Sequence, residues 1–172
     1  MSRLSRTLLT LLLLLPLPGW STDVPLFVIQ RSKNANEVQY QLRVNDRCQI
    51  VSHHPVSAFW HLRAEQPATT EPLNALDQLA YGVVRQHVAE NWVVFRLRAL
   101  EAKPIKATAT YHPDTGTCVP NVHVAINDQV AALERVYVQT DEGRVRPTVT
   151  YIDVVGITVE GPPLPVTERI TP

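Results

Sequence analysis

The feature that most constrains the fold is a strict two-residue alternation between Glu37 and Val44. Its apolar positions are Val38, Tyr40, Leu42 and Val44, and its polar positions are Glu37, Gln39, Gln41 and Arg43. This period predicts a β-strand with one buried face. The preceding run, Leu26 to Gln30, is apolar almost throughout and predicts a buried strand. Ser32 to Asn36 is then expected to form a five-residue hairpin loop, with Asn34 and Asn36 as turn residues.

The same reading applied to the rest of the chain predicts a mainly β protein. Further strands are expected near residues 48–52, 56–63, 83–88, 92–100, 107–111, 119–126, 133–140 and 148–159. Leu73 to Gly82 predicts one helix, capped by Asn74 and ended by Gly82 in the left-handed conformation. Ala64 to Pro72 is expected to be a polar loop. The fold class is therefore an antiparallel barrel or sandwich of about eight to ten short strands with one short helix.

The N-terminus has the three parts of a secretory signal peptide. Arg3 and Arg6 precede an apolar run from Leu8 to Leu17, and Gly19 and Ser21 are small residues at the −3 and −1 positions of a cleavage site. We expect a signal peptide at 1–21, cleaved near Ser21, a single β-rich domain at 22–160 and a Pro-rich C-terminal tail at 161–172. The mature protein is expected to be exported, periplasmic or extracellular, without a membrane span.

The charge balance limits the classes of binding partner, and the cysteine content indicates the cellular compartment. Removing Arg3 and Arg6 leaves 14 basic and 16 acidic residues, a balance that does not favour nucleic acid as a partner. The two cysteines, Cys48 and Cys118, both lie in the exported part and are expected to form one disulfide. The alternative is two buried thiols.

Cationic and amide side chains form the first candidate site. Polar faces of successive strands carry arginines, and the predicted hairpin loop adds a second group of donors. The tentative ligand-binding residues are Arg31, Lys33, Asn34, Asn36, His61, Arg63 and Arg96. If they converge on one concavity, they suit a small anionic or amide-bearing ligand or a protein partner. The alternative is a turn and a solvated outer face. Asp153 is expected to accept a hydrogen bond from the strand arginines Arg43, Arg63, Arg96 or Arg98.

An enzyme is the second hypothesis, a hydrolase or transferase centred on the Arg31-Ser32-Lys33-Asn34 loop. Ser32 or Lys33 would act as nucleophile or base, with Asn34 or Asn36 as oxyanion donor and His61 or Tyr81 as acid. The catalytic residues stay unknown, because the sequence alone supplies no nucleophile–base pair. The six histidines show no metal-ligand spacing, so neither a metal nor another cofactor is expected.

Four segments carry a family resemblance across nearly the whole mature chain. They are FVIQRSKNANEVQY (27–40), PVSAFWHLR (55–63), LNALDQLAYGV (73–83) and YIDVVGITVEG (151–161). In this combination the chain resembles the bacterial family known as domain of unknown function 4833. The resemblance implies a small, usually exported domain. It implies no activity and transfers no catalytic residue.

Overall fold

The computed structural model describes residues 21–141 and 148–172. Within them the chain forms eleven strands, one α-helix and one 3-10 turn. The elements are β1 (Ser21–Arg31), β2 (Asn34–Asn45), β3 (Val56–Leu62), β4 (Thr69–Pro72), α1 (Ala75–Tyr81), β5 (Val83–Val88), β6 (Val93–Leu97), η1 (Arg98–Leu100), β7 (Ile105–His112), β8 (Thr117–Ile126), β9 (Gln129–Asp141), β10 (Thr148–Thr158) and β11 (Pro165–Ile170). The signal peptide expected at the N-terminus lies outside the described residues, apart from Ser21.

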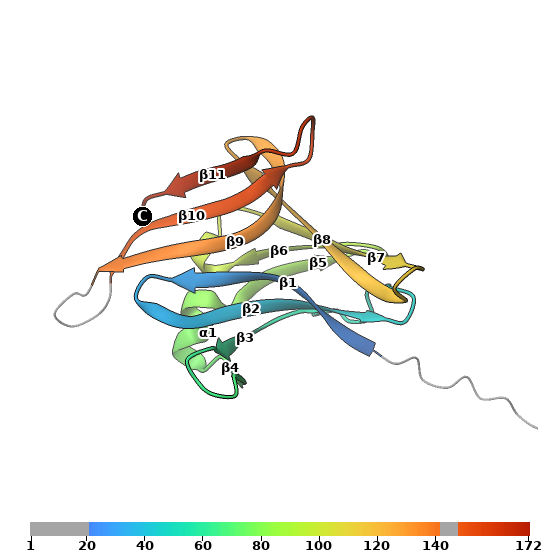
Figure 1. Ribbon diagram of the computed structural model, residues 1–172, viewed down its shortest axis with the longest axis horizontal. Helices are drawn as coiled ribbons and strands as arrows, with labels where there is room; N and C mark the ends of the chain where they lie inside the picture. Colours follow the sequence, from blue (N-terminus) through green and yellow to red (C-terminus); the bar gives the residue numbers. More distant parts are fainter. Residues whose placement is uncertain (1–20, 142–147) are drawn as a thin grey trace, which may run out of the picture.

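Strand β9 is the branch point of the sheet. One of its edges pairs with β10, which in turn pairs with β11. Its other edge pairs first with β8 and then, in parallel, with β1. Two arms leave this edge, β1–β2–β3–β4 and β8–β7–β6–β5, and they lie over one another (Figure 1). The sheet does not close, so of the two expected architectures the structure is the sandwich-like one.

The core lies between the two arms, where the predicted alternation places it. Every apolar residue of the 37–44 alternation is fully buried, as are Val93, Phe95 and Leu97 of β6. The Phe27 ring of β1 stacks on Tyr40 at 4.7 Å and on Phe95 at 6.4 Å, which joins the two arms. This confirms the mainly β fold class and the buried faces of β2 and β6.

Two segments expected to be irregular contain strands. Thr69–Pro72 forms the short edge strand β4 against β3, and all four of its residues are exposed. Pro165–Ile170, in the segment expected to be a surface tail, forms β11 and pairs with β10. Both are edge strands. In β4 no side chain is buried, and the strand is held by its backbone pairing with β3. In β11, Val166 and Ile170 are half-buried and pack against the core.

The helix has the predicted cap but a different end. The Asn74 side chain accepts hydrogen bonds from the Leu76 and Asp77 N–H groups, and Asp77 accepts one from the Asn74 N–H. Gly82 has φ −58°, so the left-handed end is wrong. Glycine is needed there for space, since a Cβ atom would lie 2.3 Å from the Gln78 carbonyl oxygen.

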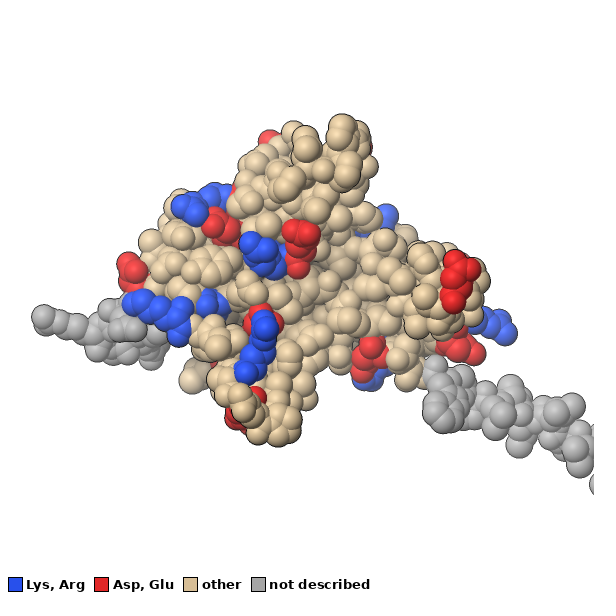
Figure 2. All heavy atoms as spheres, viewed as in Figure 1, with Lys and Arg blue, Asp and Glu red and all other residues tan. Residues whose placement is uncertain are grey.

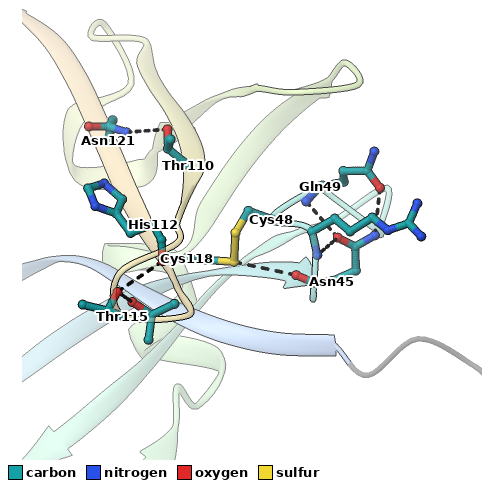
Figure 3. The surroundings of a disulfide bond; sticks show 10 residues. Asn45, Cys48, Gln49, Thr110, His112, Thr115, Cys118 and Asn121 are labelled. Atoms are coloured by element: carbon teal, nitrogen blue, oxygen red, sulfur yellow. Dashed lines mark hydrogen bonds between the residues drawn. A yellow bond between two sulfur atoms is a disulfide. The ribbon is translucent and has the colours of Figure 1, made fainter.

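The predicted disulfide is confirmed. Cys48, just after β2, bonds to Cys118 in β8, and the two Cα atoms are 5.5 Å apart (Figure 3). Asn45 orders the approach to Cys48, because its side-chain oxygen accepts hydrogen bonds from the Arg47 and Gln49 N–H groups. The bond ties the β1–β4 arm to the β5–β8 arm.

Asp153 accepts hydrogen bonds from an arginine, but the predicted partner is wrong. This carboxylate accepts two hydrogen bonds, both at 2.8 Å, from Arg169 of β11 and not from a strand arginine of the candidate site. The Arg169 hydrogen bonds hold the pKa of Asp153 below its usual value. A second bridge, Lys103–Glu168 at 2.8 Å, fastens β11 to the main sheet. Among the described residues, no helix is long and apolar enough to cross a membrane.

Candidate functional site

The candidate site lies at the turn between β1 and β2. The turn is shorter than predicted: Arg31 pairs with Asn34, so only Ser32 and Lys33 form the loop. Lys33, at φ 59°, takes the left-handed conformation in this turn, whose turn residues were expected to be Asn34 and Asn36. The end of β1 lies beside the end of β9, and α1 covers the adjacent end of the sandwich (Figure 1).

Arg31 is the central residue of this end. Its guanidinium carbon lies 4.8 Å from the centre of the Trp60 ring and 5.8 Å from that of Tyr81. Its Nε atom is buried and, among the described residues, has no hydrogen-bond partner. A buried N–H without a partner is unusual in a folded protein.

Hydrogen bonds fix the aromatic surface under Arg31. Trp60 Nε1 donates to Asp77 of α1 at 2.9 Å, and the Trp60 and Tyr81 rings meet edge to face at 5.8 Å. Tyr40 donates its hydroxyl hydrogen to the Tyr81 carbonyl oxygen at 2.6 Å. Burial, and secondly Tyr81, raise the pKa of Tyr40 far above its usual value, so its hydroxyl remains a donor. The aromatic pair is therefore held in place by both the helix and the core.

Two asparagines add donors beside Arg31. The Asn34 side-chain oxygen accepts from the Asn36 N–H at 2.9 Å, and the Asn36 side-chain oxygen accepts from the Ala64 N–H at 3.2 Å. Because the side-chain oxygens accept from backbone N–H groups, the NH₂ group is the part of each side chain that could donate to a ligand.

Arg31 and Asn34 lie between two adjoining depressions. The first, of about 250 Å³, is lined by Arg31, Asn34, Asn36, Trp60, Leu62, Glu71, Pro72, Asn74 and Asp77. The second, of about 460 Å³, is lined by Gln30, Arg31, Asn34, Ala35, Glu37, Arg63 and Tyr137. Both are predominantly polar. Glu37 is buried and lines the second depression, and it accepts hydrogen bonds from Gln30 at 2.7 Å and from Arg63 at 3.0 Å.

The structure brings together four of the seven predicted ligand residues: Arg31, Asn34, Asn36 and Arg63 line these depressions. Lys33, His61 and Arg96 line neither of them. Arg96 lies on the other arm, where it donates to the Glu101 carbonyl oxygen. Charges of both signs are interspersed over the face drawn in Figure 2, without a large patch of one sign.

The proposed nucleophile Ser32 has a structural role. Its hydroxyl oxygen accepts a hydrogen bond from the Thr140 N–H at 2.9 Å and lies 3.1 Å from the Thr140 hydroxyl. These bonds fasten the turn to β9. Within residues 21–141 and 148–172, no group of three His, Cys, Asp or Glu residues could hold a metal ion.

Sequence reasoning missed Trp60 and Asp77 as parts of the site. Trp60 contacts Arg31 and donates a hydrogen bond to Asp77, so the three residues link β1, β3 and α1. No local pattern in the sequence reports such contacts.

Fold and site together define a small sandwich-like β domain with a donor-rich depression at one end. A family model described as Domain of unknown function (DUF4833) matches residues 27–169, and the chain belongs to this family. Searches of the curated proteins and of the solved structures gave no significant match.

Proposed function

We propose that this domain binds a small anionic or amide-bearing ligand non-covalently at Arg31. The observation that supports the proposal is the buried Arg31 Nε without a partner. Leaving a buried donor unsatisfied costs about 1–3 kcal/mol. A ligand oxygen that accepts a hydrogen bond from Nε would remove this cost.

The two depressions are lined by charges of both signs, with Arg31 and Arg63 as the basic residues and Glu37, Glu71 and Asp77 as the acidic ones. The feature that supports an anion is the guanidinium group of Arg31 itself. Arg63 is neutralised by Glu37, whereas no ion pair among the described residues includes Arg31. The Asn34 and Asn36 NH₂ groups add neutral donors on the same side. A planar guanidinium with flanking amide donors suits a carboxylate or a phosphate, because it can bind two oxygens at once.

We also propose that the protein works outside the cytoplasm, after cleavage of the signal peptide near Ser21. The disulfide supports this proposal, since such bonds persist in oxidising compartments. To test it, cells that express the protein are separated into cytoplasmic and extracytoplasmic fractions. The mass of the protein in each fraction is then measured by mass spectrometry. A full-length cytoplasmic chain would contradict the proposal.

The binding proposal is tested by calorimetric titration with acetate, inorganic phosphate and acetamide. We expect weak binding of the two anions and weaker binding of acetamide. Arg31→Met should lower the affinity for the anions about 10- to 100-fold, the equivalent of one charge-assisted hydrogen bond. Arg43→Met is the matched control, because Arg43 is an exposed strand arginine paired with Asp23. If none of the probes binds, or if both variants bind equally, the proposal is wrong.

A further inference from the structure

We propose that the ligand is a single-chain amphiphile, whose anionic head group binds Arg31 and whose apolar chain lies in a neighbouring groove. The inference rests on the proposed function and names its ligand class. Three observations carry it: a row of residues across the sheet, a shared wall at Tyr81, and an exposed apolar helix face.

The row begins at Arg31 and continues into apolar residues. Arg31 pairs with Val138 of β9, and Val138 pairs with Ile152 of β10. Side chains that are directly opposite on neighbouring strands point to the same face of a sheet. Arg31, Val138 and Ile152 therefore follow one another across one face, with the cation at one end and the branched apolar side chains beyond it.

Val138 and Ile152 form the floor of an apolar groove. The groove has a volume of about 300 Å³ and is lined by Ala80, Tyr81, Ala99, Val138, Val149, Ile152 and Pro172. None of these side chains carries a charge. A ligand in the groove would be apolar over its length there, and Arg31 is the charged residue that begins the row.

Tyr81 connects the groove to the head-group site. Its ring lies 5.8 Å from the Arg31 guanidinium carbon, and the same residue lines the groove. Tyr81 is buried and hydrogen bonded through its carbonyl to Tyr40, so it is a fixed wall. One chain passing over Tyr81 would reach both places.

The helix beside the groove presents apolar side chains to water. Leu76 is 77% exposed and Leu79 is 64% exposed, although their spacing predicts a buried helix face. Leu76 and Ala80 are four residues apart and thus neighbours on the helix surface, which extends the groove lining outward. Exposed apolar surface on the helix that supplies Ala80 and Tyr81 to the groove favours a ligand with an apolar chain over a purely polar one.

The test compares chain lengths and head groups on the full chain without its signal peptide. Acetate, hexanoate and decanoate are titrated below their micellar concentrations, together with decyl phosphate and decyltrimethylammonium. We expect each added methylene that is buried to tighten binding about three- to fourfold. We also expect decyltrimethylammonium to bind at least tenfold more weakly than decanoate. Comparing decanoate with decyl phosphate distinguishes fatty acids from phosphate-headed lipids as the source of the head group.

Two variants test where the chain lies. Ala99→Trp fills the groove and should remove the gain from chain length while leaving acetate binding unchanged. Val149→Glu places a charge in the groove and should have the same effect. This variant replaces Ala99→Trp in the test if circular dichroism shows that Ala99→Trp does not fold. Ala102→Trp is the matched control, because Ala102 is exposed and lines no groove described above.

The outcomes separate this inference from the proposed function. If acetate binds through Arg31 but affinity is independent of chain length, the amphiphile is wrong and the anion site stands. If decanoate binds equally to the Arg31→Met variant, or if Ala102→Trp weakens it as much as Ala99→Trp, the placement is wrong. If no anion binds at all, both proposals are wrong.

Discussion

The two ends of the β1–β2 ribbon differ in how completely their polar groups are used. At the end near Asn45, the disulfide joins the two arms of the sandwich, and the Asn45 side chain satisfies the loop backbone (Figure 3). At the turn end, Arg31 stacks on Trp60 with a buried Nε that has no partner among the described residues. We refer to these as the disulfide end and the Arg31 end.

On the proposal that Arg31 binds the ligand, stability and binding are placed apart in this fold. Polar groups left without partners cost free energy of folding. The disulfide end can therefore be altered with a large loss of stability and little effect on binding. The Arg31 end should behave in the opposite way.

The largest effect is expected at the disulfide end. Replacing both cysteines, Cys48→Ala with Cys118→Ala, removes a cross-link between residues 70 positions apart. The chain-entropy model gives a loss of about 4 kcal/mol in the free energy of unfolding. Urea denaturation measures it. At temperatures where the variant is folded, anion affinity should equal that of the wild type; a parallel loss of binding would show that the two ends are coupled.

An intermediate effect is expected from Asp77, the acidic residue that supports the Arg31 end. Asp77→Ala removes the acceptor of the Trp60 Nε1 hydrogen bond and the acceptor of the Asn74 N–H hydrogen bond in the helix cap. The free energy of unfolding should therefore fall by about 1–2 kcal/mol. Asp23→Ala is the control at the other end of β1, where an exposed pair with Arg43 is lost and a smaller effect is expected. Equal losses in the two variants would mean that Asp77 does not specially support this end.

The alternation of apolar and polar residues made the sandwich-like β fold predictable. It did not predict that the sheet branches at β9. The residues of the 37–44 alternation, and Phe95 on the opposite arm, are buried as the two-residue period requires. The pairing of β1 with β9 depends on residues more than 100 positions apart, and no local pattern reports it. Leu76 and Leu79 show the reverse failure, since their helical spacing predicts burial and both are exposed.

The site was predictable in its chemistry and not in its geometry. Arg31, Asn34 and Asn36 stand out because cationic and amide side chains cluster in a turn. Arg96 has the same chemistry on a strand, yet it lies on the other arm. Glu37 is a polar position of the 37–44 alternation and is nevertheless buried, where Gln30 of β1 and Arg63, just after β3, donate hydrogen bonds to it. Only the pairing of strands decides such cases.

The smallest effect, and the one with the unusual sign, is expected from Arg31→Met. Methionine keeps the apolar stem over Trp60, loses a cation–π contact of about 0.5–1 kcal/mol, and removes the unsatisfied Nε, which costs about 1–3 kcal/mol. Without ligand, the free energy of unfolding should therefore rise by about 1 kcal/mol in urea denaturation, although anion binding is lost. Arg63→Met is the matched control: it takes a partner from the buried Glu37 carboxylate and should destabilise the protein. If the two variants lose stability equally, Arg31 belongs to the framework of the fold, and the contrast between the two ends does not hold.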